Sequence, residues 1–311
     1  MSKDELHVVF GASGALGSAI IRELRKQDRN VRGVNRSGKI RGTEEVEMAK
    51  ADIFDPQSSK NAVTGATVIY HCVSPPYTKW PEKHPLIMES MINLAINTGA
   101  RLVFGDNLYC YGRVQGPIAE NLPYNPHGRK GKARAQIADM LIEAHNNGKI
   151  EATIGRSSDF FGPRVLFAAI GERVVPNILR GQKVSVLGNL DVPHTYMFIE
   201  DFAKGLITLA DHNEAFGQVW HIPSAETLTT RQFLELMFEE ANAEPKISVT
   251  PNIIVSLLGI VDPTLRELKE TLYQFQDPFI LDHSKFEKAF GKTVTPHREA
   301  IHQTLDWYKN L

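Results

Sequence analysis

Three glycines near the start of the chain, in the run FGASGALG (Phe10 to Gly17), have the spacing of a phosphate-binding loop. In such a loop Gly11 allows a tight turn from strand to helix, and Gly14 lets the backbone approach a pyrophosphate. Gly17 permits the helix to pack closely on the strand, and the helix N-terminus offers its N–H groups to the phosphates. A glycine-rich turn without a ligand is the alternative. The predicted cofactor contacts in this loop are Gly11, Ser13, Gly14, Ala15, Leu16 and Gly17.

A second segment, VNRSG, indicates which dinucleotide is bound. An NAD site usually has an acidic residue about 20 residues beyond the glycines to bind the ribose hydroxyls. This chain has Asn35, Arg36 and Ser37 instead. Arg36 and the Ser37 hydroxyl can hold a 2′-phosphate by charge-assisted hydrogen bonds, which favours NADP(H) over NAD(H). A solvated surface Arg36 is the alternative. In ADIFD, Asp52 is expected to hydrogen-bond the adenine and Ile53 to cover its ring.

The elements around these residues alternate between short apolar strands and amphipathic helices. Strands of this kind, linked by helices, predict right-handed crossovers and a parallel sheet covered on both faces. We expect an α/β fold, a Rossmann-type doubly wound parallel sheet with a smaller, mainly helical C-terminal substrate lobe. The expected NADP-binding domain is 1–160, completed by about 195–225, and the lobe is mainly 161–311.

Composition excludes several classes of protein. The chain has 311 residues and a formal net charge of −1, which gives no electrostatic footprint for nucleic acid or an anionic membrane. The N-terminus lacks a signal-peptide pattern, and the apolar run 253–261 is too short to span a bilayer. Cys72 and Cys110 lie in apolar runs and indicate a reducing compartment, and no metal-ligand spacing occurs. We expect a soluble, cytoplasmic protein whose partner is a small-molecule substrate, with a homodimer as one option for its assembly.

Three further segments match a known family in order along the chain. LYCYG (108–112) is similar to S-x-x-x-V-Y-G, RSSDFFGPRV (156–165) to R-x-x-x-x-Y-G-P, and HTYMFIEDFAKGL (194–206) to R-x-F-x-x-V-x-D-x-A. With GASGALG, the chain resembles the extended short-chain dehydrogenase/reductase superfamily, the NAD(P)-dependent epimerase/dehydratase group. The resemblance implies an oxidoreductase or epimerase-like enzyme that transfers hydride on a small carbonyl or sugar-type substrate. It also implies cofactor contacts from Val73, Ser74 and Ser157, and a substrate region near Arg164, Arg173 and His194.

The catalytic core departs from this family's pattern. Active members have a Ser or Thr five residues before the glycine of "YG", and a Tyr-x-x-x-Lys pair on the next helix. The Tyr transfers a proton while the Lys holds the ribose and lowers the Tyr pKa. Counting back from Gly112 places Asn107 at the Ser/Thr position. If Lys132 is aligned with the family's lysine, Gly128 stands at the position of the family's tyrosine. A shift by one residue aligns His127 with that tyrosine, but the lysine position then holds no lysine.

Three explanations remain open for this altered core. In the first, another residue donates the proton: Tyr109, Tyr111, Tyr77 or His127. In the second, hydride passes to an activated acceptor such as an enone, for which solvent supplies the proton. The third explanation is a non-catalytic NADP(H)-binding protein with a redox-sensing or regulatory role, resembling the NmrA-like members. Basic residues at the start of the helix, among them Lys130 and Lys132, oppose its dipole. Their clustering predicts an anionic neighbour, a cofactor phosphate or a substrate carboxylate.

Overall fold

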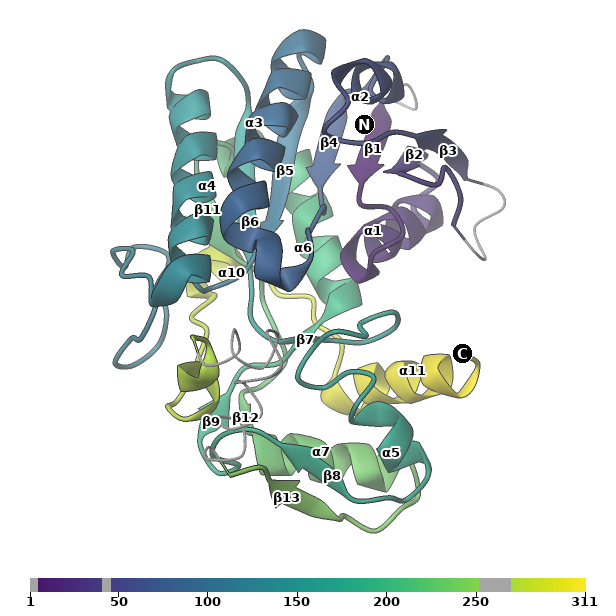
Figure 1. Cartoon of the computed structure of the whole chain (residues 1–311), viewed down its shortest axis with the longest axis vertical. Helices are drawn as coiled ribbons and strands as arrows, with labels where there is room; N and C mark the ends of the chain where they lie inside the picture. The colour runs from purple at the N-terminus through teal and green to yellow at the C-terminus, as the bar shows by residue number, and fades with distance from the viewer. Residues whose placement is uncertain (1–4, 41–45, 252–269) are drawn as a thin grey trace.

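A seven-stranded, entirely parallel sheet forms the centre of the computed structural model, which describes residues 5–40, 46–251 and 270–311 (Figure 1). The strand order is β11-β6-β5-β4-β1-β2-β3. Chain order runs outward from β1 in both directions, which is the doubly wound arrangement. The strands are β1 (Leu6–Phe10), β2 (Asn30–Asn35), β3 (Glu47–Lys50), β4 (Val68–His71), β5 (Arg101–Asp106), β6 (Ala152–Arg156) and β11 (Val219–His221).

Helices cover both faces of this sheet, as predicted. On one face lie α2 (Pro56–Ala62), α3 (Trp80–Thr98) and α4 (Gly128–Asn146); on the other lie α1 (Ala15–Lys26) and α6 (Ile199–Asp211). Successive strand residues supply the two cores in turn, because side chains alternate between the faces of a strand. Val8 and Phe10 pack in the α3/α4 core, and Val9 packs in the α1/α6 core.

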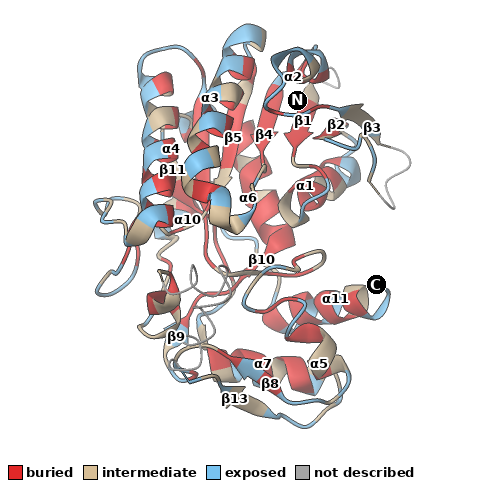
Figure 2. Cartoon of the chain, viewed as in Figure 1, coloured by how far each residue is buried: buried red, intermediate tan, exposed pale blue. Residues whose placement is uncertain are grey.

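A smaller lobe lies beyond the carboxyl ends of the strands. Its helices are α5 (Val175–Leu179), α7 (Thr230–Glu240) and α11 (His297–Lys309), with α10 (Ser284–Phe290) lying back against the sheet near Trp220. Three two-stranded sheets join it: β7 (Phe160–Phe161) with β10 (Met197–Phe198), β9 (Pro193–His194) with β12 (Leu228–Thr229), and β8 (Val184–Val186) with β13 (Ile247–Val249). Figure 2 shows buried residues along the central sheet and on the inward sides of α5, α7 and α11.

Capping residues in the sequence explain where three of the helices begin or end. Helix α3 ends at Gly99, whose φ of +70° is left-handed, as the sequence predicts for a C-cap glycine. Asp55 caps α2, and Thr229 with Gln232 forms a capping box on α7. The apolar run 253–261 lies outside the described residues. Within the described ranges, no helix is long and apolar enough to cross a membrane.

Candidate cofactor and catalytic site

The glycines of the loop after β1 allow close approaches of the backbone that a side chain would prevent. Gly11 has a φ of +83°, and a Cβ there would lie 2.6 Å from the Cys72 carbonyl oxygen. A Cβ on Gly17 would lie 2.4 Å from the Gly11 carbonyl oxygen, so α1 could not pack this closely on β1. Gly14 is the N-cap of α1, which has no side-chain cap and no acidic residue in its first turn. This N-terminus is therefore suited to an anionic group.

The predicted cofactor residues lie along the carboxyl ends of the sheet's strands. From β1 the chain first adds β2 and β3 on one side of the sheet. It then adds β4, β5, β6 and β11 on the other side of β1, so the topological switch point lies between β1 and β4. Ligands of open α/β sheets bind outside the carboxyl ends of the strands at such a point. Asn35 is the last residue of β2, and the residues that follow β2 and β3 are Arg36, Ser37, Asp52 and Ile53. Those that follow β4, β5 and β6 are Val73, Ser74, Asn107, Tyr109 and Ser157.

On the β2 side, Asn35 organises the turn that presents Arg36. Its Oδ1 accepts hydrogen bonds from the backbone N–H groups of Ser37 (3.1 Å) and Gly38 (2.7 Å). Arg36 is exposed, and within the described ranges its guanidinium forms no ion pair. Asp52 is also exposed and accepts from the Phe54 N–H, whereas Ile53 is buried.

On the β4–β5 side, two tyrosines and a lysine meet. Tyr77 lies in the short helix η1 (Tyr77–Lys79) after β4, and Tyr109 follows β5. The fully buried Lys130 places its Nζ 4.4 Å from the centroid of the Tyr77 ring and 3.8 Å from a Glu270 carboxylate oxygen. Burial raises the pKa of Tyr77, against hydrogen bonds from Thr271 and Tyr109 that lower it. Burial also raises the pKa of Tyr109 well above its usual range, so both phenols carry protons at neutral pH.

The lysine beside these tyrosines is Lys130, whereas the resemblance places Lys132 at the family's lysine position. Two residues of an α-helix turn the side chain by about 200°, so these lysines leave α4 on different sides. Lys132 is exposed, while Lys130 is buried. His127 is also exposed, and its ring contacts Tyr273 edge-on.

Any side chain at Gly128, the residue aligned with the family's tyrosine, would displace the Glu270 side chain and strain the backbone. A Cβ there would lie 2.4 Å from Glu270 Oε2, and the φ of Gly128 is +76°. Glu270 also accepts a hydrogen bond from the Lys130 N–H at 3.3 Å. Its carboxylate therefore stabilises the helix N-terminus and is an anionic neighbour of the basic helix start, where a cofactor or substrate anion was expected.

A buried charge network supports the end of β5. Asp106 accepts from Arg134 Nη1 at 3.1 Å and from Arg156 Nε at 3.0 Å. Arg156 also donates to the hydroxyls of Tyr111 (3.0 Å) and Tyr124 (2.9 Å). The Tyr111 hydroxyl in turn lies 3.0 Å from His221 Nε2, and Nδ1 of the same His221 ring contacts the Asp282 carbonyl oxygen. Tyr111 is thus enclosed in this network, unlike Tyr77 and Tyr109.

Asn107 and Ser157 follow this network at the strand ends. Asn107 Oδ1 accepts from the Tyr109 N–H at 3.1 Å and so fixes the turn that carries Tyr109. The Ser157 side chain is fully buried, and its Oγ has no hydrogen-bond partner among the described residues. A buried hydroxyl without a partner costs free energy, so this oxygen suits a ligand with a polar group. Together with the glycine loop, it fits a dinucleotide across the switch point.

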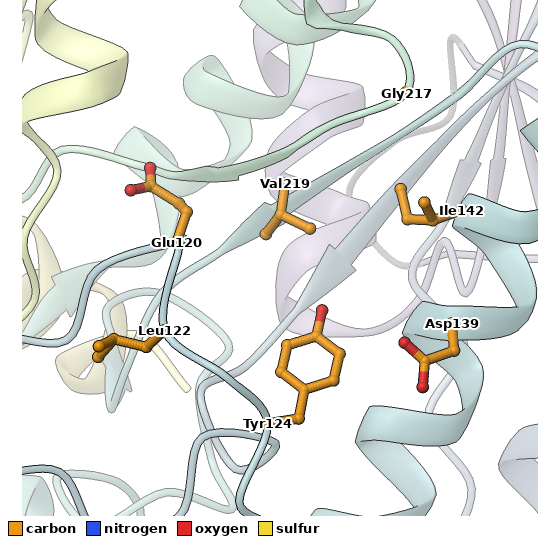
Figure 3. Close-up of a pocket in the computed structure, with 7 residues that line it drawn as sticks. All are labelled: Glu120, Leu122, Tyr124, Asp139, Ile142, Gly217 and Val219. Carbon is orange, nitrogen blue, oxygen red and sulfur yellow. The ribbon is translucent and has the colours of Figure 1, made fainter. Parts of the chain in front are cut away.

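A separate cavity of about 320 Å³ lies beside the edge strand β11 and helix α4 (Figure 3). Burial raises the pKa of two carboxyl groups in it, those of Glu120 and Asp139. None of the predicted cofactor or catalytic residues lines this cavity, so it is distinct from the cleft at the glycine loop. It is lined by Glu120, Leu122, Tyr124, Asp139, Ile142, Gly217 and Val219.

The parallel sheet and the glycine loop together define a Rossmann-type protein. A family model described as "NAD dependent epimerase/dehydratase family" matches residues 7–222. The chain belongs to this family, which confirms the resemblance found in its motifs. The chain is 24% identical to the UDP-glucuronic acid decarboxylase 4 of Arabidopsis thaliana over 273 residues, which cover 79% of this chain and 59% of that protein. The chain spans about half the length of several of the curated relatives that it matches.

Solved structures have the same fold at low identity. A dTDP-glucose 4,6-dehydratase from Bacillus anthracis str. Ames, in complex with NAD, matches with a TM-score of 0.81 at 14% identity, over 98% of this chain and 97% of the other. A UDP-glucuronic acid 4-epimerase from Bacillus cereus, in complex with UDP-glucuronic acid and NAD, matches with a TM-score of 0.79 at 15% identity, over 98% and 99%. At such identities the likeness establishes the fold alone.

Proposed function

We propose that the protein is an NADP(H)-dependent oxidoreductase or epimerase-like enzyme that acts on a small carbonyl or sugar-type substrate. The observation that carries the proposal is the buried cluster of Lys130, Tyr77 and Tyr109, which lies at the same sheet edge as the glycine loop. Solved structures of the same fold bind NAD, and one binds a sugar nucleotide, which supports the proposed classes of cofactor and substrate. A cytoplasmic location and a homodimer are further parts of the proposal.

Each side of the site has its own role in this proposal. The glycine loop and the N-terminus of α1 hold the pyrophosphate, Arg36 and Ser37 hold the 2′-phosphate, and Asp52 and Ile53 contact the adenine. Val73, Ser74 and Ser157 contact the nicotinamide half. The bound cofactor supplies hydride chemistry. Tyr109, hydrogen-bonded to Tyr77, gives a proton to a substrate oxygen. The Lys130 cation over the Tyr77 ring stabilises the negative charge that the two phenols then share.

Replacing Lys130 with methionine tests the catalytic cluster, with Lys132→Met as the matched control. General acid–base groups contribute about 10²- to 10⁴-fold to rate, so Lys130→Met is expected to lower kcat by about 10²-fold or more. Lys132 is exposed, so its replacement is expected to change kcat by less than about 2-fold. Steady-state kinetics and NADPH titration measure both. Equal effects of the two variants, or a larger one at Lys132, would contradict the assignment of Lys130.

Replacing Arg36 with alanine tests the cofactor preference. A hydrogen bond to a charged group contributes about 1.5–3 kcal/mol, so the variant is expected to bind NADPH about 10- to 100-fold more weakly. NADH lacks the 2′-phosphate, and its dissociation constant is expected to stay within about 2-fold. Fluorescence titration of both cofactors measures this, and an equal loss for NADPH and NADH would rule out recognition of the phosphate by Arg36.

A non-catalytic NADP(H)-binding protein is the second candidate function. Gly128 favours it, because a side chain at the position of the family's catalytic tyrosine would strain the backbone and displace the Glu270 carboxylate. The two functions are separated by incubating the purified protein with NADPH and a panel of carbonyls, enones and nucleotide sugars. Binding of NADPH without oxidation by any compound would favour the sensor, and oxidation with any of them would exclude it.

A further inference from the structure

Asp159 and His194 form a buried pair beyond the residues assigned above. Asp159 follows β6 and His194 ends β9. His194 Nε2 lies 2.6 Å from Asp159 Oδ2, and Nδ1 lies 3.1 Å from the backbone oxygen of Gln274. The imidazole has no exposed surface and stacks against Phe275 (centroids 5.3 Å apart) and Phe279 (5.5 Å). The Asp159 side chain is 14% exposed, so the carboxylate is the member of the pair that a ligand can reach.

The contacts of the imidazole require one extra proton. A carbonyl oxygen only accepts hydrogen bonds, so His194 Nδ1 must donate to Gln274. If Nε2 carried no hydrogen, its lone pair would face a carboxylate oxygen at 2.6 Å, which is a repulsive contact. A proton therefore lies between Nε2 and Oδ2. The pair as a whole is then neutral, which is the state that the surrounding rings of Tyr196, Phe275 and Phe279 tolerate.

Several groups face this pair from neighbouring elements. The Asp159 charge contributes to raising the pKa of four tyrosines: Tyr77 in η1, Tyr109 after β5, Tyr196 near β10, and Tyr273 in the short helix η3 (Leu272–Phe275). The Lys130 cation lies over Tyr77. Asp159 is also one of the few non-glycine residues with positive φ, at 30°. Backbone strain of this kind is concentrated at functional sites.

We propose that Asp159 and His194 act as one acid–base pair on the substrate side of the site. The inference rests on the proposed function for the identity of the substrate that receives the proton, and the pair itself does not depend on it. As a hydride reaches a substrate carbonyl carbon, the carbonyl oxygen gains the electron pair of its π bond. The proton of the pair passes through Asp159 to this oxygen or to the phenol that has just protonated it, and the pair is left with one negative charge. Solvent returns the proton at the exposed side of Asp159, and the reverse reaction moves it the opposite way.

The proton itself can be observed by NMR on the full chain with ¹⁵N-labelled histidine. At neutral pH we expect a far-downfield proton resonance that both Asp159→Asn and His194→Gln remove. The control is Ser158→Ala, which removes a different buried hydrogen bond (2.8 Å, to the Thr195 carbonyl) between the same two segments and should keep the resonance. Absence of the resonance from the unmodified protein, or its survival in Asp159→Asn, would overturn the pair. This result is independent of any turnover.

The acid–base role is measured by kinetics as a function of pH. Asp159→Asn is expected to lower kcat by about 10²-fold or more, leave NADPH affinity unchanged and remove one limb of the pH profile, with partial recovery in Asp159→Glu. A merely structural pair would lower the thermal midpoint but keep the pH profile, and that result would overturn the role. If the unmodified protein binds NADPH and reduces nothing in the panel, the proposed function fails, and this role in reduction fails with it. The NMR result then still decides whether the pair holds a proton.

Discussion

Replacing Asp106 with alanine is expected to remove about 3–5 kcal/mol of the free energy of unfolding. The variant deletes the carboxylate between Arg134 and Arg156 and leaves two buried guanidinium groups without their anion. The Asp106 side chain is completely buried, so water cannot take its place without rearrangement. Since a domain is stable by only about 5–15 kcal/mol, the loss is a large share of the total.

Denaturation by urea at pH 7.5 measures this effect. Tyr124→Phe is the matched control, because it removes one neutral acceptor from the same Arg156 guanidinium and should cost only about 1 kcal/mol. A cost for Asp106→Ala no larger than that of the control would show that the network contributes little to stability. We also expect Asp106→Ala to impair turnover in the folded fraction, because Asp106 precedes Asn107 and the turn that carries Tyr109.

The second large effect is a steep loss of stability between pH 6.5 and pH 4. Four of the buried histidines, His7, His71, His84 and His221, have a pKa that is lowered strongly by burial. Burial lowers the pKa of His7 to about 4 and those of His71 and His221 to about 3, and it lowers that of His84 further. Unfolding exposes imidazoles with an ordinary pKa of about 6.5. Below that pH the unfolded chain binds more protons than the folded one, so protonation favours unfolding.

The sign and size of this effect follow from proton linkage. Stability rises with pH over this window and levels off above about pH 6.5, where the unfolded histidines also lose their protons. Each fully buried histidine contributes a slope of about 1.4 kcal/mol per pH unit, so four together are expected to give several kcal/mol per unit. Urea midpoints measured at intervals across the window test this. His84→Leu should reduce the slope by one such increment, whereas replacing the exposed His302 should not; a flat profile would contradict the linkage.

Much of the fold can be predicted from local hydropathy and glycine patterns in the sequence. The apolar strands before and after α1, and the glycines between them, satisfy turn and packing requirements that few other residues meet. Strand β3 is different, because its four residues EMAK have no apolar run. It lies at the edge of the sheet and needs only one neighbour, so hydropathy carries little information about it.

The proposed catalytic residues are harder to predict from sequence, for two physical reasons. Within GRKGKAR, the choice between Lys130 and Lys132 depends on where α4 begins, since the helical phase decides which side chain is buried. The Asp159–His194 pair depends on a contact across 35 residues that the β7–β10 and β9–β12 ladders bring together. Spacing in the sequence carries no signal for such a contact.

The late position of α6 and β11 in the chain has a consequence for synthesis on the ribosome. Helix α1 buries Ile20, Ile21 and Leu24 in a core that also contains Phe202 and Leu206 of α6. The ribosome releases the N-terminal residues first, so α1 emerges long before its partner helix. During that interval the apolar side of α1 faces solvent or a chaperone, and the sheet lacks the edge strand β11. The half of the protein that contains the central sheet can therefore finish folding only after most of the polypeptide has been translated.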